Sequence, residues 1–469
     1  GFERIGRTRA SGRSKPPRIN ERVVELVEQE AKVFAQVRES LRESILSYEY
    51  PGELNEADDH LSFILHANNY FRQSAMANVN GISNHDKEKI LGIIEEHYKE
   101  AIWFLRDDFR CESAFREAIN QLNMSSSPGH PYCNERPTIG ERLQYDEFTR
   151  ECDAFQLSRL WHEVQDVLNG GFEVVLKTFV KQEPHKKTKA LEGRWRLIMC
   201  SPLNVQVAWQ MVFGPSCDVE IEKAIKIPSQ QGCYNVNGTW KLFYRQWKHL
   251  GLSSGVDKSA WDWTAPQWAI DLDLESRYRL CRGTAKFDWM RVAEDLYHRM
   301  FHDPVILMTD GTLYKQRVPG VMKSGCVATI SLNSKCQVIL HSKVCLDRGI
   351  SVEPMVRACG DDTLQHPKHT DNINAYRKYG VIVKSCSDGY EFVGHEYTDR
   401  GPQPLYLNKH LSKLAHVSDE ILPQYLDSMA RMYVHTEIYW FWDSLATRAG
   451  CCLPYSREYY KRWYDYAEA

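Results

Sequence analysis

Apolar residues recur along the chain at two different spacings, which predict helices near both ends and short strands in the middle. The first stretch with helical spacing covers residues 20–47, with apolar positions at Val23, Val24, Leu26, Val27, Val33, Phe34, Val37, Leu41 and Ile45. Helical patterns continue to about residue 169, apart from a polar, turn-rich interruption at 125–131. Further helices are predicted over residues 203–225, 237–249, most of 259–300, 326–348 and 408–449.

Short strands are predicted between residues 173 and 407. Residues 173–180 and 252–258 are two of them, and residues 305–308 and 313–318 flank Asp310-Gly311, a strong hairpin signal. The remaining strands are expected at 355–359, 363–365, 381–384, 390–393 and 404–407. The chain is therefore predicted to be a mixed α/β (α+β) protein with its strands concentrated in the middle.

The composition narrows the class of protein without identifying it. With 469 residues the chain could hold two or three domain-sized units, and its net charge of −3 argues against a uniformly basic nucleic-acid module. Any contact with nucleic acid must therefore come from local basic stretches. The 14 cysteines include no CxxC pair, which favours reduced thiols over a zinc ribbon or a disulfide framework. No apolar run approaches the ~18 residues that a membrane span needs.

Residues 1–18 are the first basic stretch. They carry a single Glu3 among Arg4, Arg7, Arg9, Arg13, Lys15 and Arg18, with Gly, Ser and Pro between them. This composition predicts a flexible basic arm. Contact with RNA and simple solvation both remain open for it.

Two acidic motifs could hold divalent cations. Gly360-Asp361-Asp362 lies at the apex of a predicted hairpin, where Gly360 supplies the permissive backbone that such a turn needs. Asp257 ends the predicted strand 252–258, and Asp262 follows five residues later. Carboxylates held close together on rigid backbone suit two-metal chemistry. Taken alone, each motif fits an exposed turn or loop about as well.

Two further motifs could bind a nucleotide. In residues 324–333, Thr329 and Asn333 are four positions apart at the start of a predicted helix, so they share one face. The second motif is a basic stretch opposed only by Glu183 and Glu192, and it contains Lys177, Lys181, Lys186, Lys187, Lys189, Arg194 and Arg196. Donors this dense suit a triphosphate or an RNA backbone. Polar helix caps and a solvated loop are the simpler explanations of each motif alone.

The order and spacing of the four motifs decide between these readings. Basic stretch, Asp-x4-Asp, Ser-Gly-x3-Thr-x3-Asn and Gly-Asp-Asp follow one another as in the RNA-dependent RNA polymerases of positive-strand RNA viruses, which this sequence resembles over about residues 125–397. Residues 181–185 (Lys-Gln-Glu-Pro-His) and 391–395 (Glu-Phe-Val-Gly-His) are most similar to the sobemovirus and luteovirus type. The stretch 125–131 resembles that family's template-channel motif.

The resemblance implies a right-hand polymerase with palm, fingers and thumb, the palm being built on a small antiparallel sheet. After the arm of residues 1–18, residues 19–250 would be mainly fingers, including a basic loop for incoming nucleotides at 177–198 and a palm helix at about 203–225. Residues 251–404 would be mainly palm, with a fingers insertion at about 265–320. Residues 405–469 would form a short thumb. The aromatic run Tyr439-Trp440-Phe441-Trp442 would be thumb core or a partner surface, with core favoured.

The resemblance also implies roles for single residues. Asp257 and Asp361 would be the principal ligands of two Mg²⁺ ions, supported by Asp362, and Mn²⁺ could replace Mg²⁺. Asp262 and Asn333 would form a hydrogen-bonded pair that reads the ribose 2′-hydroxyl, which would penalise an analogue that lacks it.

Further residues would surround this centre. Lys189 and Arg196 would contact the triphosphate, and Lys181 and Arg194 the same channel. Ser324 and Gly325 would form an adjustable loop, Thr329 would support the sugar-reading pair, and the template would meet Ser126, Ser127, Pro128 and Gly129. Lys384 would protonate the pyrophosphate leaving group, with Lys378 as the alternative.

The implied partners are template and nascent RNA and NTPs. A genome-linked protein primer and other viral replication proteins are further candidates, and the expected location is the host cytoplasm at replication complexes. Priming with or without a primer stays open. Two rival functions also remain, a catalytically silent RNA-binding scaffold and a reverse transcriptase.

Two other patterns are expected to be decoys. Residues 251–255 match the G-x-S-x-G pattern, but Ser253 follows a predicted helix and precedes a strand, the reverse of a nucleophile elbow. Glu294, His298 and His302 share a helix face, yet no further ligand for zinc is apparent.

Overall fold

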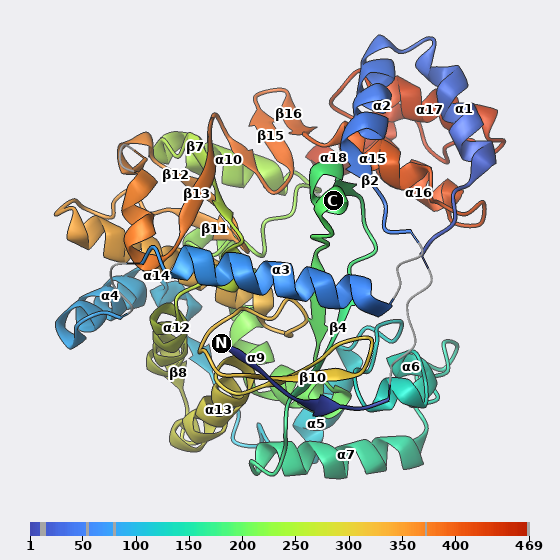
Figure 1. Cartoon of the computed structure of the whole chain (residues 1–469). Coiled ribbons are helices and arrows are strands. Elements are labelled where there is room, and N and C mark those ends of the chain that lie inside the picture. Colours follow the sequence, from blue (N-terminus) through green and yellow to red (C-terminus); the bar gives the residue numbers. More distant parts are fainter. Residues whose placement is uncertain (10–15, 53–55, 78–80, 371–372, 467–469) are drawn as a thin grey trace.

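One sheet of the fold has four antiparallel strands and lies in the upper left part of the view in Figure 1. The computed structural model describes residues 1–9, 16–52, 56–77, 81–370 and 373–466. We call this sheet the palm sheet; its order is β11 (Arg357–Cys359), β12 (Asp362–Gln365), β7 (Ser254–Ser259) and β13 (Ile382–Asp388). Every neighbouring pair is antiparallel. The mixed α/β class and the small antiparallel sheet are confirmed.

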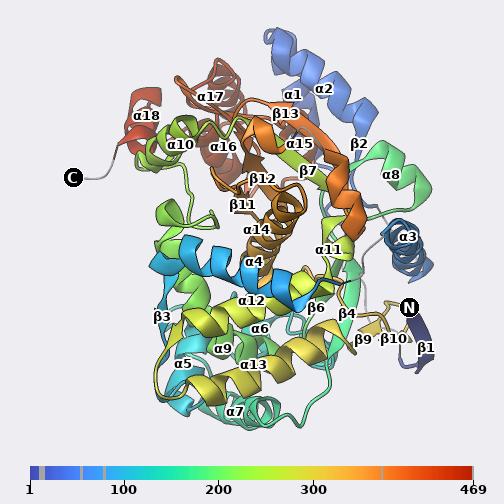
Figure 2. The ribbon, with the colours of Figure 1, turned by 90° about the vertical axis from the view of Figure 1, so that its left-hand side faces the viewer.

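Helix α14 (Thr329–Asp347) supports the palm sheet from behind. It is buried continuously from residue 331 to 345, and it packs against β11 on one side and against α12 (Gln267–Leu280) and α4 (Asn84–His97) on the other (Figure 2). Its Lys335 ammonium lies 2.9 Å from the Glu220 carboxylate of α9 (Leu203–Glu222) in this interior. A charge this deeply buried is stable only when paired, so α14 is fixed in position by its polar residues as well as its apolar ones.

A second, five-stranded sheet lies apart from the palm sheet (Figure 2). Its order is β1 (Phe2–Arg7), β10 (Thr312–Gln316), β9 (Val305–Leu307), β4 (Val175–Val180) and β6 (Leu197–Cys200). The predicted hairpin at Asp310-Gly311 is confirmed by antiparallel pairing of β9 with β10.

The N-terminal stretch departs from the sequence prediction. Strand β1 pairs antiparallel with β10, so a flexible arm over residues 1–18 was the wrong prediction for the part that β1 occupies. The Phe2 ring lies 5.1 Å from that of Phe63 and 6.1 Å from that of Trp263, centroid to centroid, which anchors the strand. The part of the predicted arm at 10–15 lies outside the described residues.

The predicted helix over 20–47 is two helices, α1 (Glu21–Ala31) and α2 (Ala35–Ser47). The chain turns between them because Phe34 takes an extended conformation, with φ −106° and ψ 101°. Both helices pack into the apolar core formed by the C-terminal helices, although the sequence assigned residues 19–250 mainly to the fingers. Figure 1 shows α1 and α2 beside α15 (Leu407–Leu414), α16 (Leu422–Met432) and α17 (Tyr439–Arg448).

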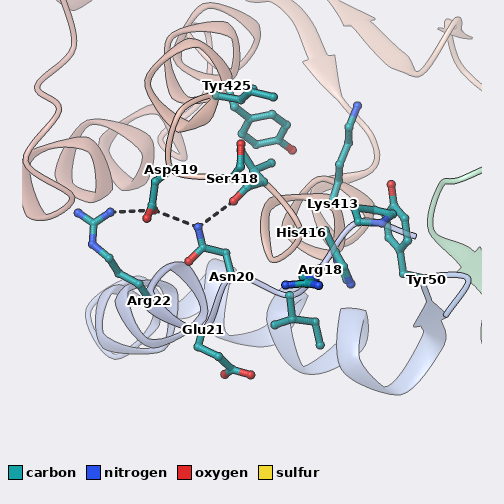
Figure 3. A pocket seen from close by; sticks show the side chains of 14 residues that line it. Arg18, Asn20, Glu21, Arg22, Tyr50, Lys413, His416, Ser418, Asp419 and Tyr425 are labelled. Carbon is teal, nitrogen blue, oxygen red and sulfur yellow. Dashed lines mark hydrogen bonds and ion pairs between the residues drawn. The ribbon is translucent and has the colours of Figure 1, made fainter. Parts of the chain in front are cut away.

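The aromatic run on α17 belongs to this core. Tyr439, Phe441 and Trp442 are buried, and Trp440 is half exposed, which confirms the favoured reading. Beside the core, a cavity of about 830 Å³ is lined by residues 17–22, Tyr50 and residues of the 413–425 segment (Figure 3). Asn20 donates hydrogen bonds to the Val417 carbonyl (2.9 Å) and the Asp419 carboxylate (3.0 Å) there. None of the predicted site residues lines this cavity.

The other elements are short or peripheral to the predicted site. The remaining helices are α3 (Glu56–Ser74), α5 (Glu112–Asn120), α6 (Ile139–Arg142), α7 (Ala154–Leu168), α8 (Lys187–Glu192), α10 (Thr239–Leu250), α11 (Trp261–Thr264), α13 (Lys286–Phe301) and α18 (Arg457–Asp465). Two-stranded ladders join β2 (Tyr48–Glu49) to β5 (His185–Lys186) and β3 (Trp103–Phe104) to β8 (Cys281–Arg282). A last sheet contains β14 (Glu391–Phe392), β15 (His395–Thr398) and β16 (Gly401–Pro404).

Three smaller predictions can be compared with these elements. The strand expected at 404–407 instead occupies 401–404, and β15 was not foreseen. All 14 cysteines have free thiols, as expected from their spacing. Over the described ranges, no helix combines the length and apolar character that crossing a bilayer requires.

Candidate active site

The Gly360-Asp361 turn joins β11 to β12, closed by the pair Cys359 and Asp362. Gly360 has φ 61°, a left-handed conformation that side chains disfavour, although a Cβ there would meet nothing within 4 Å. The left-handed backbone conformation therefore explains why glycine occupies this position, since there is room for a side chain.

Helix α14 holds this turn from behind. The Gly360 amide donates to the Ser334 hydroxyl at 2.9 Å, and the Gln337 amide donates to the Asp361 carbonyl at 3.3 Å. Sequence reasoning missed both of these polar residues, which look like ordinary helix residues in the one-dimensional pattern. They make the turn rigid, as a carboxylate-bearing turn needs to be if it is to position ions.

Strand β7 brings Asp257 to the same edge of the palm sheet. Thr363 pairs with Val256, so Asp257 and Asp362 are the next residues on neighbouring strands. On the other side of β7, the Lys384 ammonium of β13 lies 3.4 Å from the Asp257 carboxylate. The alternative, Lys378, lies 3.4 Å from Asp347 instead. Of the two lysines, Lys384 is therefore the one that lies beside a predicted metal-binding carboxylate.

The three carboxylates act on one another electrostatically. Burial, followed by repulsion from Asp361 and Asp257, raises the pKa of Asp362 to about 6. Like charges held side by side disfavour ionisation unless a cation neutralises them, and oxygen-only donors suit Mg²⁺. The residues present therefore fit the magnesium site that the sequence predicted.

The predicted sugar-reading pair is in contact. The Asn333 amide donates to the Asp262 carboxylate at 3.2 Å, and the Trp261 indole donates to the Asn333 carbonyl oxygen at 2.9 Å. An indole N–H can only donate, so Trp261 fixes which way the Asn333 amide faces. Ala260, at φ 50°, turns the chain from β7 into α11 and places these neighbours. No sequence pattern indicated the role of Trp261.

Asp262 lies within electrostatic reach of both the acidic and the basic residues. Burial and then Asp361 raise its pKa to about 6, while Asn333, Arg196 and Lys181 act in the opposite direction.

The basic stretch is folded, not a simple loop. It contains β5 and the short helix α8, and its Glu183 carboxylate accepts from Arg196 (2.8 Å) and Lys181 (3.2 Å). Burial, and then Lys384, Arg194 and Arg196, lower the pKa of Lys189. These cations lie close enough together to disfavour one another's charge, and such a cluster attracts an anion although Glu183 and Glu192 pair with some of its members. Arg194 is partly neutralised by Glu192 at 2.6 Å.

The Ser324-Gly325 loop packs on β6. The Ser324 hydroxyl donates to the Leu197 carbonyl at 3.2 Å, and Gly325 bridges Cys200. The Thr329 hydroxyl lies 2.7 Å from the Lys323 carbonyl and 2.6 Å from that of Cys326. Thr329 therefore fixes the loop itself, whereas the sequence assigned it to the sugar-reading pair.

The predicted template residues lie against the C-terminal end of β6 and the residues that follow it. Ser126 is exposed, Ser127 is partly buried, and Pro128 and Gly129 are buried. Gly129 has φ 70°, and a Cβ there would lie 2.3 Å from the Ser201 carbonyl oxygen. The two predicted loops thus share β6 and the residues that follow it as a common support.

We expect Gly325→Ala to lower the free energy of unfolding by about 1–3 kcal/mol, because overpacking forces the backbone apart. The new Cβ would lie 2.1 Å from the Met199 carbonyl oxygen. Urea unfolding measures the effect. Gly92→Ala on α4 is the control, since a Cβ there meets nothing within 4 Å. Equal midpoints for Gly325→Ala and the unchanged chain would show that the loop moves freely.

The G-x-S-x-G pattern and the histidine pair on α13 are not functional sites of the kind their patterns suggest. Ser253 follows α10 and precedes β7, so it lacks the strand-then-helix setting of a nucleophile elbow. His298 and His302 stack on each other at 4.9 Å, and in the described part of the chain they belong to no metal-ligand group.

Comparisons with known proteins found matches in family, sequence and fold. The family model described as viral RNA-dependent RNA polymerase matches residues 37–383. Protein P1-P2 of Potato leafroll virus is 28% identical over 333 residues, covering 64% of this chain and 30% of that protein. Replicase polyprotein P2AB of Southern bean mosaic virus is 31% identical over 295 residues, covering 60% and 28%.

Two further similarities concern proteins of more similar length. The RNA-directed RNA polymerase of Mushroom bacilliform virus is 28% identical over 299 residues, covering 60% of this chain and 70% of that protein. The solved Sicinivirus 3Dpol RNA-dependent RNA polymerase superposes with a TM-score of 0.69 at 15% identity, covering 98% of both chains, a likeness of fold. The chain thus matches less than a third of the length of Protein P1-P2 and of Replicase polyprotein P2AB.

Proposed function

This chain belongs to the viral RNA-dependent RNA polymerase family, and from that premise we propose that it copies an RNA template by adding NTPs to the 3′ end of a growing RNA. Pyrophosphate would be released at each addition, and the RNA copied would be the genome of a positive-strand virus. Similarity to Protein P1-P2 of Potato leafroll virus and to Replicase polyprotein P2AB of Southern bean mosaic virus supports the sobemovirus and luteovirus type.

The position of Asp262 is the observation that carries the proposal. Its carboxylate is influenced by Asp361 on the acidic side and by Arg196 and Lys181 on the basic side. A group that reads a ribose hydroxyl must lie between the metal-bound phosphates and the rest of the nucleotide. The acidic, sugar-reading and basic side chains that a ribonucleoside triphosphate needs are therefore within reach of one another.

We propose that Asp257 and Asp361, with Asp362 in support, hold two Mg²⁺ ions, for which Mn²⁺ could substitute. When bound, such ions activate the attacking 3′-hydroxyl and neutralise charge that develops at phosphorus. Asp257 and Asp362 occupy adjacent positions on neighbouring strands, and Asp361 lies in the turn that precedes β12, so the three carboxylates supply the oxygen donors that such ions prefer.

Both rival functions are less well supported. Burial and repulsion between carboxylates raise the pKa of Asp362, and such a partly buried acid destabilises the fold. A catalytically silent scaffold would gain nothing from it in return. A reverse transcriptase would have no use for the Asp262–Asn333 pair, which the indole of Trp261 holds in place.

The test is incorporation of labelled NTPs on a defined RNA template by the purified chain. Reactions with no primer, with an RNA primer and with a genome-linked protein would separate the modes of initiation and test that protein as a partner. Template-length product made from NTPs supports the proposal. Failure to extend an annealed primer with Mg²⁺ or Mn²⁺ present would refute it.

We expect Lys384→Ala to lower the rate of incorporation about 10²-fold, as loss of a general acid typically does. Lys378→Ala is the matched control, because its ammonium pairs with Asp347 and not with Asp257. Single-turnover rates across pH measure the effect, and the limb that reports the acid should disappear in Lys384→Ala. An equal loss in both variants would assign the acid elsewhere.

A further inference from the structure

Three buried side chains with metal-binding atoms meet behind the palm sheet. His341 and Cys345 are one turn apart on α14, and His369 lies in the short 3₁₀ turn that follows β12. One ligand atom from each lies within 4.8 Å of the others, and each residue is 2% exposed. In the part of the chain that the structure describes, no other group of His, Cys, Asp or Glu is gathered in this way.

Hydrogen bonds fix the state of His369. Its Nε2 lies 2.9 Å from the Ser351 carbonyl oxygen, which can only accept, so Nε2 carries the proton. The Nδ1 atom is then left with a lone pair, and it is buried with no hydrogen-bond partner. A buried acceptor without a partner costs free energy that native structures normally avoid.

His341 is arranged in a similar way. Its Nδ1 lies 3.2 Å from the Tyr376 hydroxyl, and its Nε2 lies 3.6 Å from the Cys345 sulfur. An ordinary thiol–imidazole hydrogen bond would explain His341 and Cys345, but it leaves His369 unexplained. A histidine that ligates a metal characteristically gives its other N–H to a carbonyl or hydroxyl, as both of these can.

We propose that His341, Cys345 and His369 bind one Zn²⁺ ion through two imidazole nitrogens and a thiolate, with the fourth position left for water. Two nitrogens and one sulfur form a donor set that suits zinc better than the oxygen-preferring Mg²⁺. Ligand atoms around tetrahedral zinc lie about 3.5 Å apart, so small side-chain rotations would close the site. The Cys345 thiol would give its proton to solvent on binding.

The place of this site in the fold suggests what it would do. Helix α14 also carries Asn333 and Ser334, which contact Asp262 and the Gly360 amide. His369 follows β12, the strand that begins at Asp362. A zinc ion would therefore tie the helix that supports the site to the strand that carries its carboxylates.

The test is metal binding by the full chain. After dialysis against a chelator, the chain is titrated with Zn²⁺ against a chromogenic chelator in excess Mg²⁺, which occupies the carboxylate site. We expect one equivalent to bind, with at least a tenfold loss of affinity in both Cys345→Ser and His369→Asn. Cys336→Ala, which removes another buried thiol from the same helix, should bind as the unchanged chain does.

The absorption spectrum of bound cobalt reports which residues ligate the metal, and a change in folding stability alone would not alter it. Co²⁺ in this site should show a thiolate-to-metal charge-transfer band, which His369→Asn should weaken and Cys345→Ser should abolish. Less than one equivalent of zinc in the folded chain would overturn the proposal. So would a cobalt band that persists in Cys345→Ser. Because neither readout involves RNA synthesis, the result is independent of the function proposed above.

Discussion

Asp361→Asn is expected to lower kcat for template-directed nucleotide incorporation about 10³-fold, because charge stabilisation by metal ions is worth several kcal/mol and each 1.36 kcal/mol is tenfold in rate. The residue lies at the apex of the β11–β12 turn, exposed to solvent and held from behind by Gln337. Asparagine keeps the shape and removes the charge. Primer extension with saturating NTP measures the effect, and raising Mg²⁺ tenfold should recover only part of it.

Asp399→Asn is the matched control for charge. Asp399 pairs with Lys248 on the surface, and its side chain is 82% exposed. Incorporation by this variant should equal that of the unchanged chain. If Asp361→Asn incorporated nucleotides at the normal rate, the assignment of the catalytic carboxylates would be wrong.

The stability of Asp361→Asn separates lost chemistry from lost folding. Burial and then Asp361 raise the pKa of both Asp362 and Asp262 to about 6, from the ordinary value of 3.8. Between pH 4 and 6 the native state then holds more protons than the unfolded state, so stability falls as pH rises. Removing Asp361 should reduce this fall by about 1 kcal/mol in chelator, leaving the variant more stable than the unchanged chain at pH 7.

The fold could be predicted where local patterns determine it. Gly360 between two apolar strands indicated the hairpin, and Asp310-Gly311 indicated the other, because turn residues act over a few positions. Pairing of β1 with β10 joins residues about 300 apart, and no local pattern contains it. For the same reason, no local pattern showed that α1 packs against the C-terminal helices.

The same contrast between local patterns and long-range contacts applies to the candidate site. The resemblance identified the pair Asp262 and Asn333, which are in contact, but not the indole of Trp261 that orients them. It assigned Thr329 by its place in a motif, whereas the hydroxyl binds the carbonyls of its own loop. Cysteine spacing gave no sign of the His341, Cys345 and His369 cluster, since His369 reaches it only through the folded hairpin.

Asp262→Ala should lower the preference for NTP over dNTP, measured as the ratio of kcat/KM values, by about 10²–10³-fold. A site built to bond a hydroxyl can reject an analogue without it by about 10⁴–10⁵-fold, and this variant leaves Asn333 as the only reader. The loss should fall mainly on NTP, because the hydroxyl loses its partner, while dNTP use stays nearly constant. Parallel primer extension with each nucleotide gives both ratios.

Asn333→Asp is the second variant, and it distinguishes reading from charge. It would place two carboxylates in contact where the amide now donates to Asp262 at 3.2 Å, so like-charge repulsion should disrupt the pair. Both variants should lose discrimination between NTP and dNTP. Asn333→Asp should regain part of it at a pH low enough for one proton, shared between the two carboxylates, to restore a hydrogen bond. Unchanged discrimination in Asp262→Ala would mean that another group reads the sugar, and the basic side of the site, around Arg196, would then be the place to look.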